Sequence, residues 1–376
     1  MKDNKIKILK SFQDTEFSSL SLRRNFEINS LNYLIDSGYV NLDTPVIESA
    51  DLFFRKSLGS TSGNTYTFTD PQNQQVSLRP DFTASIMRYA FSNHGKIENN
   101  LGKYCYSGPV FRFENNNESY NQLYQIGAEY ISKKKNGYES QVIFDAVKCL
   151  QINNVKEFKI KLGNVGIVRE YLDKIGLNNS LVEFFLTNLK LFNSKNYEEE
   201  LLSKAKFQNL IKSSKKTENL SKDEIKEKFS IELQSNLGLR SQDEVVDRYF
   251  NKLSNQVIES EFNVSIIKLK ELLNIDLENI SRNIIATEIN FEDFENLIDS
   301  LLDFGIQKNN ICIDFSLTRN LAYYDGVVFD LIFKNELIGG GGKYDDLPKM
   351  LGYKSDYSCF GFAINISKFT DVYKNE

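Results

Sequence analysis

Alternating side chains along residues 122–132, Gln-Leu-Tyr-Gln-Ile-Gly-Ala-Glu-Tyr-Ile-Ser, predict a strand with two different faces. One face is apolar and can cover a core; it comprises Tyr124, Ile126, Ala128 and Tyr130. The other face places Gln125 and Glu129 on either side of Gly127. These two polar residues lie roughly 13 Å apart along a strand, so a small ligand could lie between them, over the glycine. A solvated sheet face is the simpler interpretation of this strand taken alone.

An apolar stripe over residues 21–37 predicts a helix, with Ser21 as its N-cap and Gly38 as its stop signal. Residues 39–48 then predict a strand interrupted by Pro45. Because proline cannot donate to a central ladder, this strand belongs at an edge or an interface. The combination is typical of a dimer element, and an ordinary helix–strand unit is the alternative.

Residues 66–69 and 75–78 flank a turn and predict a hairpin. Pro80 follows, where a helix can begin, and Asp81 would lie in the first turn of that helix. A carboxylate there is stabilised by the helix dipole, which is a purely structural role. Asp81 and Thr83 at a strand-to-helix junction can also hold the ammonium group of a ligand.

Residues 104–114 predict a second strand, with Arg112 and Glu114 on one face. An arginine on a sheet face is suited to clamping a phosphate or a carboxylate. A structural ion pair between Arg112 and Glu114 or Glu129 is an equally good interpretation.

Sheet-like alternation occurs on both sides of a long region, residues 166–304, that is helical in pattern and contains no proline. This region reads as an insertion. The strand-like segments around it are 158–162, 310–316 and 317–333. Residues 337–346 follow with four glycines running from a strand, and residues 358–368 are a glycine-containing apolar segment. The four glycines within 337–346 are only a weak nucleotide-binding signal, because no Walker lysine pattern and no G-x-G-x-x-G is present.

Composition argues against several classes of protein and of site. The 376 residues include 28 Phe and 19 Tyr, enough for a large core, and the net charge of -5 argues against a nucleic-acid binder. The four cysteines have no metal-type spacing and predict reduced, buried thiols in a cytoplasmic protein. A single histidine, His94, excludes a His-pair metal site and a His-based triad with a spare. No apolar run is long enough to span a bilayer.

Five segments together resemble the class II aminoacyl-tRNA synthetase core of the histidyl type. Residues 21–37 with the Pro45 strand resemble motif 1, residues 104–129 resemble motif 2, and residues 339–345 with 359–368 resemble motif 3. Leu78-Arg-Pro-Asp-Phe-Thr83 and Arg319-Asn-Leu-Ala-Tyr-Tyr324 are similar to the two histidine-binding signatures of that family.

The resemblance implies an α+β fold, an antiparallel sheet flanked by helices. The first part of the synthetase-like core would comprise residues 1–165 and the second part residues 305–376. The helical insertion, residues 166–304, would lie between them in the sequence.

The resemblance also implies roles for single residues. Asp81 and Thr83 would hold the amino group of a bound histidine, and Arg319 would contact its carboxylate. The rest of the histidine pocket would comprise Gln125, Glu129, Tyr323 and Tyr324. A vestigial nucleotide or phosphate site would comprise Arg112, Glu114 and Lys368.

Several positions depart from the synthetase pattern. The loop 115–119, Asn-Asn-Asn-Glu-Ser, carries no cation where the synthetases place arginines and a lysine. Lys368 stands in place of the motif 3 arginine, and Asp81 in place of a glutamate. The sequence ends eight residues after Lys368, where a histidyl-tRNA synthetase continues into an anticodon-binding domain.

With these departures the chain looks like the regulatory subunit of ATP phosphoribosyltransferase, the synthetase paralogue of histidine biosynthesis. That resemblance implies a non-catalytic, cytoplasmic protein without a cofactor or metal, which binds L-histidine for allosteric feedback. It also implies a homodimer, formed through the motif 1-like element, that joins a short-form catalytic subunit in a hetero-oligomer and binds neither tRNA nor membranes. An active histidine-activating enzyme and an amino-acid-binding module for another partner are the alternatives.

Overall fold

The computed structural model describes the chain with gaps. The described residues are 6–56, 65–92, 102–113, 120–133, 137–212, 226, 256–280, 289–317, 319, 323–354 and 356–374. The chain divides into two compact units. The first comprises Met1–Gly166, Asp276–Ser281 and Asn290–Glu376, and the second comprises Ile167–Ile275 and Arg282–Ile289.

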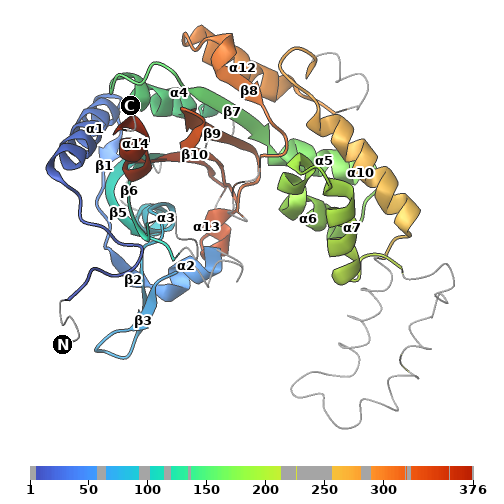
Figure 1. The fold of residues 1–376 in the computed structure, drawn as a ribbon, viewed down its shortest axis with the longest axis horizontal. Helices are drawn as coiled ribbons and strands as arrows, with labels where there is room; N and C mark the ends of the chain where they lie inside the picture. The colour runs from blue at the N-terminus through green and yellow to red at the C-terminus, as the bar shows by residue number, and fades with distance from the viewer. Residues whose placement is uncertain are drawn as a thin grey trace, which may run out of the picture. The chain divides into compact units, whose positions relative to one another are not determined.

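An 8-stranded sheet is the centre of the first unit, with strand order β1-β5-β6-β11-β10-β9-β7-β8 (Figure 1). Its inner strands pair antiparallel, whereas the short edge strands β1 and β8 pair parallel with β5 and β7. The strands are β1 Val40–Asn41, β5 Gly102–Phe111, β6 Gln122–Ser132, β7 Lys159–Asn164, β8 Ile311–Ile313, β9 Val327–Phe333, β10 Glu336–Lys343 and β11 Ser358–Asn365. This architecture confirms the predicted α+β fold with an antiparallel sheet flanked by helices.

Helices of the first unit pack on both faces of this sheet. They are α1 Phe17–Asp36, α2 Ala50–Lys56, α3 Thr83–Ser92, α4 Glu139–Gln151, α12 Glu292–Asp303, α13 Leu347–Met350 and α14 Ile366–Lys374, with the 3₁₀ turn η3 Lys308–Asn310. On one face α1, α4 and α14 contact the central strands, and the predicted apolar side of β6 is buried there, with Ile126 and Ala128 fully covered. On the other face α3 packs against Tyr104, Tyr106 and Ile131.

The strand predicted at residues 122–132 is confirmed as β6. The second predicted strand is shorter than expected, because β5 ends at Phe111. Arg112 therefore lies beyond the strand. Glu114 lies outside the described residues, so its predicted position on the same face as Arg112 stays a prediction. The glycine-containing apolar segment at residues 358–368 forms β11 up to Asn365 and then the start of α14.

The proline-bearing segment separates into two short edge strands, β1 and β2 Ile47–Ser49, with Pro45 between them. The predicted hairpin is confirmed, because β3 Thr67–Thr69 pairs antiparallel with β4 Gln75–Leu78, and β2 completes this second sheet. Two predicted helix starts are wrong. Helix α1 begins at Phe17, before Ser21, and α3 begins at Thr83, so Asp81 precedes the first turn.

The second unit is helical, with α5 Val165–Lys174, α6 Asn179–Asn188, η2 Leu189–Asn193, α7 Tyr197–Phe207 and α10 Glu259–Leu273. Its core is aromatic: the rings of Phe185 and Phe262 stack with centroids 5.3 Å apart. The predicted insertion extends further, to residue 304, but α12 belongs to the first unit. Apolar residues of α12 pack against that unit, for example Phe294 on Phe315.

All four cysteines are described, and none forms a disulfide. Cys105, Cys149 and Cys359 are buried as predicted, but Cys312 is exposed on the edge strand β8, so the prediction of a buried thiol is wrong there. His94 lies outside the described residues. Within the described ranges no helix is long and apolar enough to cross a membrane.

Arg79, which follows β4, joins three separate segments and is only 1% exposed. Its Nε donates to the Pro109 carbonyl at 2.9 Å and its Nη1 to the Thr44 carbonyl at 2.5 Å. The guanidinium also lies 3.9 Å from the centroid of the Phe82 ring. Burial lowers the pKa of Arg79, and the nearby Asp43 carboxylate opposes that shift. Arg79 thereby fixes the β1–β2 connection and the start of α3 to β5.

Replacing Arg79 by methionine leaves the two carbonyl groups without donors, so we expect Arg79→Met to lower the free energy of unfolding by about 2–4 kcal/mol. The control is Arg55→Met, which removes only an exposed pair with Asp51 on α2 and should cost less than about 1 kcal/mol. Urea denaturation followed by circular dichroism measures both. Equal midpoints for the two variants would contradict the role given to Arg79.

Candidate functional site

Glu129 on β6 is the centre of a buried hydrogen-bond cluster and is 1% exposed. Its Oε1 accepts from Thr83 Oγ1 at 2.7 Å and from the Tyr106 hydroxyl at 3.2 Å. The Tyr344 hydroxyl donates to its Oε2. The interpretation of this strand face as solvated is therefore wrong, because α3, β5 and the residue after β10 cover it.

Glycines leave the space that this cluster needs. A Cβ on Gly361, which pairs with Glu129 across β11 and β6, would lie 1.7 Å from Glu129 Oε2. A Cβ on Gly127 would lie 2.5 Å from the Tyr106 hydroxyl oxygen and 2.2 Å from the Phe362 carbonyl oxygen. Tyr106 thus occupies the space over Gly127 that the sequence suggested for a ligand.

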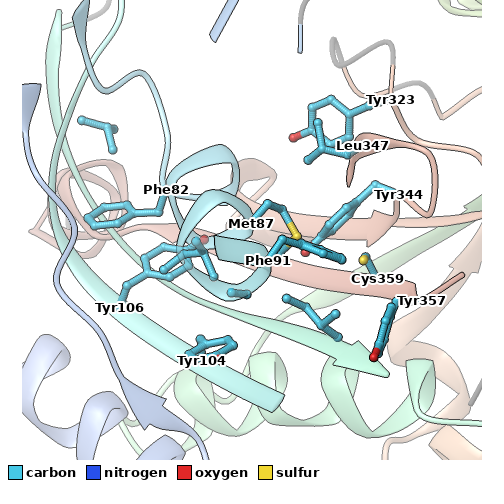
Figure 2. Close-up of a cluster of buried hydrophobic side chains, with 14 residues drawn as sticks. Phe82, Met87, Phe91, Tyr104, Tyr106, Tyr323, Tyr344, Leu347, Tyr357 and Cys359 are labelled. Carbon is cyan, nitrogen blue, oxygen red and sulfur yellow. The ribbon is translucent and has the colours of Figure 1, made fainter. Parts of the chain in front are cut away.

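Aromatic rings enclose the carboxylate from several elements. Phe82 stacks on Tyr106 with ring centroids 4.3 Å apart. The Tyr323 ring meets Tyr324 at 4.8 Å and the edge of Tyr344 at 5.8 Å. Figure 2 shows Phe82 and Tyr106 on one side of Met87, with Tyr323 and Tyr344 on the other. The side chains around Glu129 therefore come from α3, β5 and the segments that flank β9 and β10.

Two carboxylates dominate the electrostatics of this pocket. Burial raises the pKa of Tyr323, and the charges of Tyr324, Asp81 and Glu129 raise it further. Burial also raises the pKa of Tyr106, and the charges of Glu129 and Asp81 raise it further. Both hydroxyls consequently stay protonated and act as donors near neutral pH. A region with two carboxylates and several neutral hydroxyls favours a ligand that carries positive charge and N–H donors.

Gln125 lies on the same strand face as Glu129 and is 6% exposed. Its Oε1 has no hydrogen-bond partner among the described residues. A buried carbonyl oxygen without a donor costs free energy, and a ligand N–H or a water molecule would remove that cost. Gln125 is therefore available to a ligand on this strand face, roughly 13 Å along the strand from Glu129.

Arg319 reaches the same region but already has protein partners. Its Nη1 donates to the Phe329 carbonyl at 2.9 Å and lies 3.2 Å from Asp330 Oδ1. A Cβ on Gly340 would lie 1.9 Å from this Nη1, so the glycine run of β10 makes room for the guanidinium. Burial raises the pKa of Tyr324 to about 12 despite the opposing charge of Arg319, which places the cation beside the tyrosines.

The predicted nucleotide-contacting residues do not gather in the same way. Arg112 Nε donates to the Pro80 carbonyl at 2.8 Å, and this arginine has no carboxylate partner in the described part of the chain. The structural ion pair with Glu129 considered for Arg112 is therefore absent. Lys368 lies on α14, where its Nζ forms an exposed ion pair with Glu336 at 2.7 Å.

The structure thus brings Thr83, Tyr323 and Tyr324 together with Glu129, and Asp81 and Arg319 act on the same tyrosines. Sequence reasoning missed Tyr106, Tyr344 and Asp330. The sequence could have indicated Tyr106, because this residue lies on the strand adjacent to β6 and pairs with Gly127.

Asp325 adjoins this pocket, directly after Tyr324. Its Oδ2 accepts from the Asp346 backbone N–H at 3.1 Å. Burial and then the charge of Asp345 raise its pKa to about 6, whereas that hydrogen bond and Lys343 lower it. The folded state therefore binds this proton more tightly than the unfolded chain does.

Because the pKa of Asp325 is higher in the folded state, its contribution to the free energy of unfolding falls as pH rises from about 4 to about 6. Asp325→Asn keeps an oxygen acceptor and removes the titration. We expect the variant to gain stability relative to the wild type as pH increases across this window, as measured by urea unfolding at several pH values. A constant difference at every pH would contradict the raised pKa.

Comparisons with known proteins agree with this geometry. The sequence profile described as Histidyl-tRNA synthetase matches residues 12–228 and 251–369. The histidine–tRNA ligase of Sulfurisphaera tokodaii is 26% identical over 336 residues, which are 88% of this chain and 67% of that protein. This chain thus spans about two thirds of the length of that relative.

Two solved structures share the fold. A histidine–tRNA ligase subunit from Alicyclobacillus acidocaldarius has a TM-score of 0.65 at 21% identity, covering 99% of this chain and 98% of its own. A Bacillus halodurans C protein described as an ATP phosphoribosyltransferase regulatory subunit/histidyl-tRNA synthetase has a TM-score of 0.66 at 19% identity, covering 97% and 82%. The profile match extends over most of the chain and includes every residue of the cluster around Glu129, so the protein belongs to the histidyl-tRNA synthetase family.

Proposed function

We propose that this chain is a non-catalytic regulatory subunit of an ATP phosphoribosyltransferase and that it binds L-histidine for feedback control of histidine biosynthesis. The observation that carries the proposal is a contrast between two parts of the fold. The pocket around Glu129 suits histidine, whereas the positions expected to hold nucleotide phosphates are poor in available cations. The likeness to the Bacillus halodurans C protein supports the same assignment.

Histidine carries an ammonium group, a carboxylate and an imidazole with N–H donors. Asp81 and Thr83 suit the ammonium group, and Glu129 with Gln125 suits the imidazole N–H groups. Tyr323 and Tyr324 add aromatic walls, and Arg319 supplies positive charge for the carboxylate. This assignment uses every residue predicted for the histidine pocket.

The positions expected to hold nucleotide phosphates differ from the histidine pocket in their charges. Lys368 is engaged by Glu336, and the loop 115–119 contains no cation in its sequence. Arg319 is charge-paired with Asp330. These features support binding of histidine without efficient adenylation, because adenylation needs cations at the transferred phosphate.

The proposed assembly is a homodimer that joins a short-form catalytic subunit. Support comes from exposed apolar side chains on the motif 1-like element, namely Ile28, Ile35, Val40, Val46 and Ile47. Histidine can regulate the partner only if it binds one quaternary state more tightly than another. Neither tRNA nor a membrane is a partner in this proposal, in keeping with the net charge of -5.

A histidine-activating enzyme is the second candidate function. Arg112 favours it, because its guanidinium lacks a carboxylate partner in the described ranges and is free for a phosphate. The curated relatives named histidine–tRNA ligase favour it as well.

Glu129→Gln tests the histidine pocket. The substitution keeps the shape but removes a charge that accepts N–H donors, so we expect at least tenfold weaker L-histidine binding, or about 1.4 kcal/mol or more. Isothermal titration calorimetry measures the affinity, and circular dichroism checks the fold. Glu183→Gln, which removes an exposed ion pair with Arg169 in the second unit, is the control. Unchanged affinity in Glu129→Gln would remove Glu129 from the pocket.

Co-expression with a short-form catalytic ATP phosphoribosyltransferase subunit from the same genome tests the function. We expect the two chains to co-purify, phosphoribosyl transfer to require this chain, and L-histidine to inhibit it. A parallel assay measures histidine-dependent ATP–pyrophosphate exchange by the isolated chain. Exchange without complex formation would overturn the regulatory assignment in favour of the histidine-activating enzyme.

A further inference from the structure

A hollow of about 700 Å³ opens in the first unit at the far end of the β9–β10 hairpin from Glu129. Its walls are the end of α4, the start of β7, the α12–β8 connection and the β9–β10 turn. Tyr344, which contacts Glu129, follows the other end of β10. Eight residues of strand separate this tyrosine from the turn, or roughly 27 Å, so the hollow is a separate site.

The lining combines positive charge with neutral hydrogen-bonding groups. Three lysines, Lys156, Lys159 and Lys334, line the hollow together with a single carboxylate, Glu157. Carboxamides provide the other polar side chains, namely Gln151, Gln307, Asn309, Asn310 and Asn335. The lining also includes the buried apolar residues Val155, Phe158 and Ile306. In a protein of net charge -5, this excess of cations around one concavity is a local exception.

Two of these cations have no partner among the residues that the structure describes. Lys156 and Lys159 make no ion pair or side-chain hydrogen bond with any residue that the structure describes. Lys161, two residues further along β7, is by contrast paired with Asp314. The ammonium groups of Lys156 and Lys159 are therefore available to an anion.

Lys334 occupies an unfavourable backbone conformation at the edge of the hollow. The two-residue turn has φ of 49° at Lys334 and 64° at Asn335. Such a turn favours Asn-Gly, and a left-handed conformation is unfavourable for a lysine because its Cβ crowds the backbone. A strained residue kept at a concave surface is a pointer to function. Asparagine would fit this position better, yet it would remove the charge.

We propose that this hollow binds a phosphorylated small molecule of about the size of a nucleotide. The volume falls within the roughly 300–1,000 Å³ range of ligand pockets. The lysines would neutralise the phosphate groups, and the carboxamides would hydrogen-bond hydroxyl groups or the edge of a base. The site is distinct from the Glu129 pocket and does not depend on the function proposed above.

The competing explanation is purely structural. Helices α4 and α12 both end near the hollow, and cations near helix C-termini stabilise the fold. Lys148 provides the matched control, since it lies in the last turn of α4 but does not line the hollow. If the lysines serve only the helix ends, removing them changes the melting temperature and leaves ligand binding unchanged.

The test is isothermal titration calorimetry of the full chain with ADP, with pyrophosphate and adenosine as competitors. The double variant Lys159→Gln/Lys334→Asn should weaken ADP binding at least tenfold, whereas Lys148→Gln should leave it unchanged. Glu157→Gln should strengthen binding, because it removes the carboxylate that repels the phosphates. Pyrophosphate should displace ADP and adenosine should not.

Several results would overturn the proposal. They are the absence of ADP and pyrophosphate binding, an unchanged affinity in the double variant, and displacement by adenosine alone. The histidine titration of the same double variant keeps the two proposals apart, because the Glu129 pocket is untouched and L-histidine affinity should match the wild type.

Discussion

The centre of this fold depends on the burial of one carboxylate, that of Glu129. Glu129 is almost fully buried, so it needs donors on both oxygens, and it receives them from Thr83, Tyr106 and Tyr344. Each donor comes from a different segment of the chain. The segments must therefore stay in register, and the same requirement holds the side chains around Glu129 in place.

The sheet meets this requirement by joining distant parts of the sequence. Strand β6 pairs with β5 on one side and with β11, more than 200 residues later, on the other. Gly361 leaves room for the carboxylate, and Gly127 leaves room for Tyr106. Arg79 adds a second anchor, since it ties the β1–β2 connection to β5 and supports Phe82 beneath Tyr106. The path from the proposed dimer element to Glu129 thus consists of packed, buried groups.

The β9–β10 hairpin links two chemically opposite regions of the first unit. One end lies beside Asp81, Glu129 and the tyrosines, where negative charge favours a cationic ligand. The turn at the other end carries Lys334 and borders the lysine-lined hollow. Any coupling between the two proposed sites would act equally in both directions.

The sequence by itself determined the local features. Alternation placed β6 from residue 122 to residue 132, the turn residues placed the β3–β4 hairpin, and Pro45 excluded a central strand, because these depend on side-chain period and backbone geometry. Motif resemblance predicted the fold, and it singled out Glu129 as a residue of the candidate site.

Only the tertiary structure decided which groups are buried and paired. It placed Tyr106 over Gly127, Asp330 against Arg319, Glu336 against Lys368 and α12 on the first unit. These outcomes depend on contacts between residues far apart in sequence. Desolvation and charge pairing depend on distances in space, and the sequence pattern does not contain those distances.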